Sequence, residues 1–396
     1  MDEHEKEMYR RIIKWFKGRK QNPFKIDIEL HRRCNLRCLS CSRRSSPDYE
    51  RLNEISKSLE MPLEKWLEIV DEAAELNVRE WHIAGGGEPM FLADKVIAVM
   101  KRIKKYGMLG IITTNGTLWK NEHIETVVKI GWDRIHFSLD APNAKVHDYL
   151  RQVPGTFKRV IKTIKKFNQL KKKYKTEKPM LNINMVLSKK NYKFLPQMVN
   201  LAKKLNIQFL FVDPLIVYSE LGAKLKMSKK EIENFSKYLE KARELARKFG
   251  INNNFDGLQN NLQPELIEKS SQMRKVVENE IKKAEKLKMK SFLKKFLIVP
   301  CFKPWFHMTI KCDGRTTSCD VPVTGGEYIR NKTLKEVWFG EYFNWLRKAL
   351  LSKKIPNFCD QCNASHATQR RKYRVEIIKL ISPNLFEEVK KIYGLV

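Results

Sequence analysis

Hydrophobic positions follow two different periods along residues 25–255. Runs with an apolar residue at every second position predict strands, and longer stretches with apolar residues three or four apart predict helices. The predicted strands are KIDIEL (25–30), EWHIA (80–84), GIITT (110–114), RIHFSL (134–139), LNINMVL (181–187) and IQFLFV (207–212). Strands that alternate with helices form parallel sheets. Six such units predict an α/β fold, a partial (β/α)6 TIM-like barrel that is two units short of the closed form.

Two of the predicted helices have clear boundaries. The helix at 62–76 has a proline at an early position, Pro62, and an apolar stripe on one face. The helix at 229–249 follows a capping-box pattern formed by Ser228 and Glu231, and Gly250 ends it. These signals predict regular helices that pack against the sheet.

The pattern changes after residue 255. Residues 256–299 are polar and Lys-rich, and we interpret them as a solvated linker helix; the alternative is a basic surface that docks a substrate or a lipid face. The chain of 396 residues is long enough for a barrel with an appendage. The expected organisation is a basic N-terminal helix (1–24), the barrel (25–255), the linker (256–299) and a cysteine-rich domain with a basic tail (300–396).

The charge of the chain is strongly positive. There are 78 Lys and Arg residues against 45 Asp and Glu residues, which gives a formal net charge of +33. Such a field attracts RNA, phosphate-bearing substrates or an anionic membrane surface. A Lys-rich surface is also typical of heat-loving organisms, although Glu usually rises with Lys there. The chain has no apolar run near the roughly 18–20 residues of a membrane span, and its charged N-terminus lacks a signal-peptide core, so we expect a cytoplasmic protein.

The eight cysteines lie in two groups at opposite ends of the chain. The first group is Cys34, Cys38 and Cys41, and the second is Cys301, Cys312, Cys319, Cys359 and Cys362. Without a secretion signal, structural disulfides are not expected. The grouping therefore predicts two metal sites.

The first group has the spacing C-x3-C-x2-C directly after the first predicted strand. Thiolates are the usual ligands of iron–sulfur clusters. Three cysteines leave one iron of a [4Fe–4S] cluster open, and an open iron can bind the amine and carboxylate of S-adenosylmethionine (SAM). Zinc is the alternative, but a structural zinc site needs four ligands and His31 is the available neighbour.

Three segments resemble the motifs of the radical SAM superfamily: CNLRCLSC (34–41), HIAGGGEPM (82–90) and SLDAPNAKVHDYLR (138–151). The resemblance implies that Gly86, Gly87 and Glu88 hold the SAM amino group. It also implies that Ser138 contacts the ribose and Arg151 the carboxylate or sulfonium region, with Asn184 as a further candidate. Many relatives have an aromatic residue where this chain has Ser40, which leaves the adenine contacts open. These motifs fall at or after the ends of predicted strands, where active sites of βα barrels collect.

The second cysteine group resembles the start of the auxiliary-cluster extension called SPASM. Cys301 is followed after twelve residues by Gly314 and after four more by Cys319; the C-x2-C pair Cys359 and Cys362 comes later, and no cysteine follows it. These four cysteines match one fully ligated [4Fe–4S] cluster, as in the shortened Twitch form. A four-cysteine zinc site is the alternative. Cys312 is left over, as a packed thiol or a residue near the substrate.

The resemblance implies an enzyme that cleaves SAM reductively to a 5′-deoxyadenosyl radical and removes hydrogen from an unactivated C–H bond. An external donor such as ferredoxin or flavodoxin would supply the electron. The auxiliary cluster would take an electron back from the substrate, relay electrons or hold the substrate. Asp320, beside Cys319, is a candidate proton acceptor.

The substrate is the most open point. About 24 residues precede the first strand, too few for the winged-helix recognition domain of many peptide modifiers, so we expect an anionic small-molecule, sugar- or lipid-linked substrate. The alternatives are a peptide or protein, as in enzymes of the ribosomal-peptide or sulfatase-maturase type, or RNA. Two other classes of protein are alternatives. One is a zinc-containing RNA-binding protein. The other is an electron-transfer or cluster-carrier protein, and in such a protein the GGGEP and SLD segments would have no function.

Overall fold

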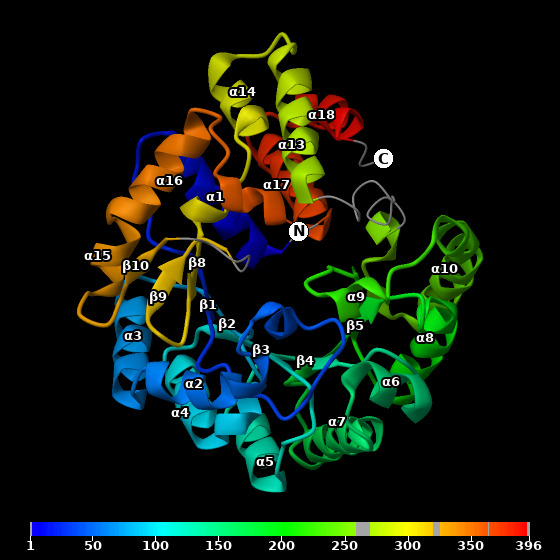
Figure 1. The fold of residues 1–396 in the computed structure, drawn as a ribbon. Coiled ribbons are helices and arrows are strands. Elements are labelled where there is room, and N and C mark those ends of the chain that lie inside the picture. The colour runs from blue at the N-terminus through cyan, green and yellow to red at the C-terminus, as the bar shows by residue number, and fades with distance from the viewer. Residues whose placement is uncertain (1, 259–269, 320–324, 363, 394–396) are drawn as a thin grey trace.

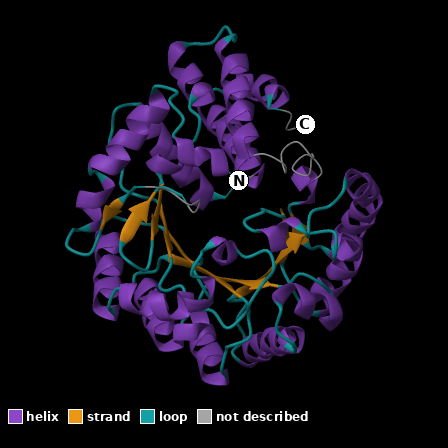
Figure 2. Ribbon diagram, viewed as in Figure 1, coloured by secondary structure: helices purple, strands orange, loops and turns teal. Residues whose placement is uncertain are grey.

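A curved, largely parallel sheet forms the centre of the molecule (Figures 1 and 2). The computed structural model describes residues 2–258, 270–319, 325–362 and 364–393. Within these ranges the strand order is β10-β9-β8-β1-β2-β3-β4-β5-β6-β7. Six strands match the predicted ones: β1 (Lys25–Ile28), β2 (Glu80–Ile83), β3 (Leu109–Thr114), β4 (Arg134–Ser138), β5 (Met180–Leu187) and β6 (Phe209–Pro214). The predicted partial barrel is therefore confirmed.

Helices cover the outer face of the arc that these strands form (Figure 2). They are α3 (Leu63–Glu75), α4 (Ala93–Lys105), α5 (Asn121–Lys129), α6 (Ala144–Arg151), α7 (Thr156–Lys173), α8 (Leu195–Lys204) and α10 (Lys229–Phe249). The short helices α2 (Leu52–Leu59) and α9 (Glu220–Ala223) follow β1 and β6, and β7 (Asn252–Asn253) ends the row. Large apolar side chains such as Trp66 and Trp81 are fully buried in the core.

The predicted boundaries hold where local signals define them. Ser228 and Glu231 form the expected capping box of α10, and Gly250 ends that helix in the left-handed conformation with φ 67°. Pro62 is the N-cap of α3 rather than its first helical residue. Strand β6 begins two residues later than predicted, because Phe209 is the first residue in register with β5.

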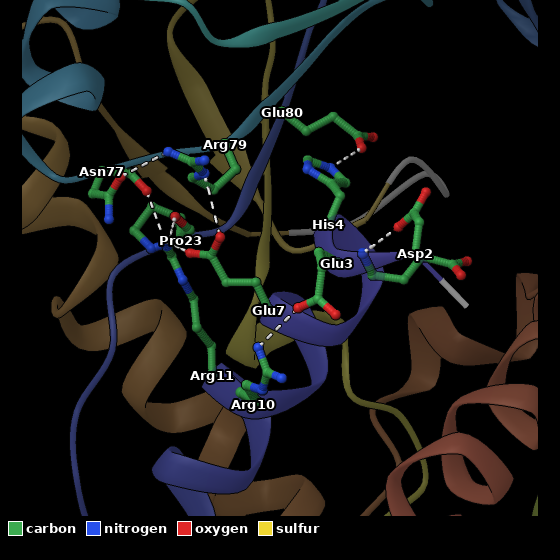
Figure 3. Close-up of polar contacts among 11 residues, drawn as sticks. Asp2, Glu3, His4, Glu7, Arg10, Arg11, Pro23, Asn77, Arg79 and Glu80 are labelled. Atoms are coloured by element: carbon green, nitrogen blue, oxygen red, sulfur yellow. Dashed lines mark hydrogen bonds and ion pairs between the residues drawn. The ribbon is translucent and has the colours of Figure 1, made fainter. Parts of the chain in front are cut away.

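Helix α1 (Glu3–Phe16) lies beside the N-terminal ends of β1 and β2 (Figure 3). His4 contacts Glu80, the first residue of β2, with 2.9 Å between Nε2 and Oε2. Arg11 donates to the backbone carbonyls of Pro23 and Asn77, which precede β1 and β2. The apolar face of α1 is buried at Tyr9 and Ile12. The predicted N-terminal helix is thus packed against the barrel.

The C-terminal part of the chain continues the same sheet. Strand β8 (His307–Ile310) pairs in parallel with β1, with Lys25 opposite His307 and Ile28 opposite Ile310. Strands β9 (Arg315–Thr317) and β10 (Glu327–Tyr328) add antiparallel neighbours. Helices α15 (Leu334–Trp338) and α16 (Glu341–Leu351) follow. The cysteine-rich extension is therefore joined to the barrel by backbone hydrogen bonds.

A second, smaller core lies at one end of the molecule, among helices that Figure 1 shows together. They are α13 (Ser270–Glu285), α14 (Ser291–Ile298), α17 (Ala364–Ile381) and α18 (Phe386–Ile392). Ala284 and Leu297 belong to this core, and Ile281 of α13 is buried as well. The interpretation of 256–299 as a solvated linker is therefore wrong for its described part, because sparse apolar residues at helical spacing bury one face. No helix among the described residues is long and apolar enough to cross a membrane.

Candidate active site

The three N-terminal cysteines lie on the loop that leaves β1. Each is half-buried, and the thiols of Cys34 and Cys41 both interact electrostatically with Cys38. Asn53 brackets Cys34, accepting from its N–H at 3.0 Å and donating to its carbonyl at 3.2 Å. Burial raises the pKa of Cys34 to about 12 and also raises the pKa of Cys41. Neutral thiols are therefore favoured until a metal centre displaces their protons.

Arg151 links this loop to the end of α6. Its carbonyl accepts from the N–H of Arg37 at 3.3 Å, and its guanidinium donates to Cys38 Sγ at 3.6 Å. The same guanidinium pairs with Asp140, with 2.8 Å between Nη2 and Oδ2. Burial lowers the pKa of Arg151, but Asp140 and Cys38 raise it by more than burial lowers it, so the net shift is upward. The predicted SAM-binding arginine lies beside the cysteine loop, and Asp140, which the sequence analysis left without a role, holds it there.

The glycine turn after β2 is seated directly on the cysteine loop. A Cβ on Gly87 would lie 2.0 Å from the carbonyl oxygen of Arg33, and one on Gly86 would lie 2.6 Å from the carbonyl oxygen of His31. The N–H of Glu88 donates to the Arg33 carbonyl at 2.9 Å. Only glycine permits this approach of two backbones. The turn and the loop therefore form one surface.

His31 supports this junction and is not free to bind a metal. Its Nε2 lies 3.2 Å from the carbonyl oxygen of Pro89, and its Nδ1 accepts from the N–H of Arg33 at 3.1 Å. The carbonyl needs a donor, so Nε2 carries the proton. Burial lowers the pKa of His31, which favours this neutral tautomer.

Glu88 is a buried carboxyl group between β2 and β3. It accepts from the Thr114 hydroxyl at 2.5 Å, the Asn115 N–H at 2.6 Å and the Met90 N–H at 3.2 Å. Burial raises the pKa of Glu88 to about 7, although these hydrogen bonds lower it. Asn115 also donates to Asn35 at 3.0 Å, which links the end of β3 to the cysteine loop. Residues 113–116 (TTNG), at the end of β3, thus hold the predicted SAM-binding residues in place. The sequence alone did not predict this role.

Ser138 and Asn184 lie opposite each other on β4 and β5. Ser138 is the last residue of β4, at the same edge of the sheet as the glycine turn. Asn184 lies in the middle of β5, and its Oδ1 is 3.2 Å from Nδ1 of His136. The register therefore places Ser138 and Asn184 at the same level of the sheet, although β5 continues for three residues beyond Asn184.

The four C-terminal cysteines of the predicted cluster come together from three segments. Cys301 precedes β8, Cys319 follows β9, and Cys359 and Cys362 precede α17. Burial raises the pKa of Cys359, and Cys301, Cys319 and Cys362 raise it further, which indicates their proximity. Within the described ranges, no three His, Cys, Asp or Glu side chains converge as ligands of a single metal ion would. The thiolates of an iron–sulfur cluster bind different irons, so they need not meet at one point.

Three further residues of the C-terminal segment remain to be described: Cys312, His307 and Asp320. Cys312 is fully buried away from the other cysteines, and burial raises its pKa to about 12, as fits a packed thiol. His307 hydrogen-bonds the Ser318 carbonyl with Nδ1 at 2.8 Å, and its Nε2 lies 3.0 Å from Asp27. Asp320 lies outside the described residues.

Comparison with known proteins matches two families. The family model described as the radical SAM superfamily matches residues 28–202, and that of the SPASM iron–sulfur cluster-binding domain matches residues 301–363. A tungsten-containing aldehyde ferredoxin oxidoreductase cofactor-modifying protein of Pyrococcus furiosus is 28% identical over 48% of this chain and 51% of its own length. A PqqA peptide cyclase of Granulibacter bethesdensis is 29% identical over 46% of this chain and 44% of its own. The chain thus matches about half the length of these relatives.

Among solved structures, SuiB of Streptococcus suis has a similar fold. The TM-score is 0.60 at 20% identity, over 83% of this chain and 68% of SuiB. The chain thus contains a radical SAM domain over residues 28–202 and a C-terminal SPASM domain over residues 301–363, and both are domains of iron–sulfur enzymes. Its cofactors are accordingly SAM with a [4Fe–4S] cluster, and an auxiliary iron–sulfur cluster.

The residues present fit these groups. A cluster that leaves one iron for SAM needs three thiols, and the β1 loop supplies three. The backbone junction at Gly86 and Gly87 leaves no room for side chains, and Glu88 places a buried carboxyl group beside it, as a bound ammonium group requires.

Proposed function

We propose that this enzyme uses SAM to oxidise a residue of a peptide or protein, and that the C-terminal cysteines hold a single auxiliary [4Fe–4S] cluster that accepts an electron from the substrate. The observation that carries the proposal is the joining of the two cysteine groups through one sheet, since β8 pairs with β1 between them. Neighbouring redox centres on one rigid sheet suit an electron transfer from a substrate bound between them.

Cys34, Cys38 and Cys41 are proposed as ligands of the SAM-binding cluster. When bound there, the cluster and SAM supply the reductive cleavage that yields the 5′-deoxyadenosyl radical. Gly86 and Gly87 would offer backbone groups to the SAM ammonium group, and Glu88 would offset its charge. Arg151, already oriented by Asp140, would pair with the carboxylate through its planar fork.

Ser138 is proposed as a ribose contact, because it ends β4 at the same edge as the glycine turn. Asn184 is proposed as a further SAM contact, because it lies opposite Ser138 on the neighbouring strand.

Cys301, Cys319, Cys359 and Cys362 are proposed as ligands of the auxiliary cluster. When bound there, the cluster would supply a one-electron acceptor for a substrate that has lost a hydrogen atom. A nearby base would take the proton, and a one-electron protein carrier such as ferredoxin or flavodoxin would take the electron on. Asp320 remains the proposed base because it follows the ligand Cys319.

The comparisons favour a peptide substrate over the small anionic molecule expected from the sequence. The PqqA relative is named a peptide cyclase, and SuiB was solved with a precursor peptide. The small-molecule expectation depended on the short segment before β1. That segment forms α1, which is packed against the barrel and gives no information about the substrate.

The cofactor assignment is tested with Cys38→Ala and the matched control Cys312→Ala. After anaerobic reconstitution, the unmodified protein should hold about eight irons and form 5′-deoxyadenosine from SAM with dithionite. Cys38→Ala should hold about four irons and form no product. Cys312→Ala should behave like the unmodified protein, because the buried Cys312 is not among the proposed ligands of either cluster. Equal product from the Cys38 variant would refute the assignment of the first site, and four irons with one zinc would refute that of the second.

The substrate class is tested by fractionating an extract of the host cells. The fraction that accelerates 5′-deoxyadenosine formation should be the peptide fraction, and protease treatment should abolish the effect. Acceleration by a protease-resistant fraction below about 1 kDa would overturn the peptide proposal and restore the small-molecule expectation. Because radical SAM chemistry often proceeds slowly without substrate, the measured quantity is the fold-increase over the rate without extract.

A further inference from the structure

A buried arginine contacts the C-terminal cysteine group from outside the SPASM domain. Arg370 lies on α17, beyond the residues that either family matches, and its side chain is almost fully buried. Its Nη1 donates to Cys362 Sγ at 3.1 Å. A hydrogen bond from a cation to a sulfur ligand is one of the features that set the reduction potential of an iron–sulfur cluster.

Two further arginines of α17 and a glutamate of α13 lie near Arg370. Glu280, also outside both matched regions, accepts from Arg371 at 2.6 Å and from Arg374 at 2.8 Å. Burial raises the pKa of Glu280, but Arg374, Arg371 and Arg370 lower it by more, so the net shift is downward. Arg370 and Arg374 are buried. The thiolates of a cluster would add negative charge beside these buried cations.

The N-terminal cysteine group has a similar arginine in a different electrostatic setting. Arg151 donates to Cys38 Sγ at 3.6 Å, and Asp140 pairs with it directly at 2.8 Å. Arg370 makes the shorter sulfur contact, and the carboxylate near it is bonded to its neighbours Arg371 and Arg374. Arg370 therefore lies closer to its sulfur than Arg151 does to Cys38.

We infer that Arg370 raises the reduction potential of the auxiliary cluster and so makes it an electron acceptor. This inference rests on the proposed function of that cluster. Reduction adds one negative charge to a site that already carries four thiolates, and a buried cation 3.1 Å from one sulfur stabilises the reduced state more than the oxidised state. Arg370 is thus a tuning residue that acts through Cys362.

The test measures the potential of the auxiliary cluster alone. Cys34, Cys38 and Cys41 are replaced by Ala in every sample to remove the first cluster, and about four irons per chain confirm that the second is present. Potentials are measured by redox titration followed by electron paramagnetic resonance. The variants are Arg370→Met, which removes the charge, and Arg370→Lys, which keeps it. Arg371→Met is the matched control, because Arg371 bonds Glu280 and is partly exposed.

Arg370→Met should lower the potential by a tenfold change in the one-electron equilibrium, about 59 mV. Arg370→Lys should give an intermediate value, and Arg371→Met should leave the potential unchanged. An unchanged potential in Arg370→Met with full iron content overturns the inference. An equal shift in Arg371→Met also overturns it, because the effect would then come from net charge alone. If Arg370→Met loses iron, Arg370→Lys decides: it must titrate below the unmodified protein.

The measurement uses neither SAM nor substrate. A failure of the enzyme to act on peptides would therefore leave this result intact. Conversely, an unchanged potential would leave the proposed peptide oxidation standing.

Discussion

Replacing Gly87 by Ala should separate two backbones that the active site needs in contact. The new Cβ would lie 2.0 Å from the carbonyl oxygen of Arg33, and 2.6 Å and 2.7 Å from the carbonyl carbons of Arg33 and Arg32. These atoms belong to the backbone, so no rotamer change relieves the overlap, and the turn must move by more than 1 Å. Overpacking of this kind costs about 1–3 kcal/mol. Losing the hydrogen bond from Glu88 N–H to the Arg33 carbonyl adds about 1 kcal/mol.

We therefore expect Gly87→Ala to lower the free energy of unfolding of the metal-free protein by about 2–4 kcal/mol, measured by urea denaturation. SAM affinity of the reconstituted protein should also fall, measured by calorimetry. The matched control is Gly222→Ala. Its Cβ would meet Ser219 Oγ at 3.6 Å and the Leu39 carbonyl at 3.7 Å; both are ordinary contacts, and the second is with the same cysteine loop. A Gly87 variant with the stability and SAM affinity of this control would refute the reasoning.

Three further predictions concern buried charges. Burial raises the pKa of Glu88 to about 7, so the folded protein retains a proton that the unfolded chain loses above pH 4.5. The free energy of unfolding should then fall by up to about 3 kcal/mol from pH 4.5 to 7. Glu88→Gln should lack this fall. If urea titrations give the same dependence of unfolding free energy on pH for both proteins, the prediction is wrong. Asp133 accepts from Lys104, Lys178 and the Gly110 N–H, and although burial raises its pKa, these partners make the net shift downward. Asp133→Asn should lose about 1–3 kcal/mol at pH 7, and the difference should shrink as the pH falls below the ordinary value of 3.8, which acid titration of both proteins would show. Arg347 lies 4.4 Å from the centre of the Trp338 ring and donates to the Pro304 carbonyl. Arg347→Lys should therefore lower the urea midpoint by an amount equivalent to about 2 kcal/mol. An unchanged midpoint would show that the planar guanidinium is not required.

The six barrel strands were predictable because their side chains alternate between the helix layer and the interior. In β2, Trp81 and Ile83 are buried while Glu80 and His82 are half-buried, and this alternation is visible in the sequence. Strand β8 is different, because its sequence HMTI is only four residues long and all four residues are buried, although polar and apolar residues alternate in it. Its pairing with β1 joins residues about 280 positions apart, which local patterns do not encode.

The candidate site was predictable where one short motif contains the chemistry. The cysteine spacing and the GGGEP turn identified residues that the structure places against one another. The residues that hold them were not identified: Asp140 lies within the quoted SLD motif, yet its pairing with Arg151 depends on how α6 returns to the loop. Arg370 was missed for the same reason, since a lysine- and arginine-rich tail contains no local signal that one side chain points at a sulfur.

The shared strand pair β1–β8 makes the spacing between the two redox centres a property of the backbone. Four residues of each strand are in register, and the Glu29 N–H donates to the Ile310 carbonyl at the end of the pair. A slip by one residue would turn every side chain of β8 to the opposite face, so the register is strongly specified. In the proposed function, electron transfer depends steeply on distance, and this ladder keeps the distance between the two cysteine groups constant. The chain between β6 and β8 contributes Glu280 near Arg370, so homologues that vary it would change the charge near the second group while the spacing stays the same.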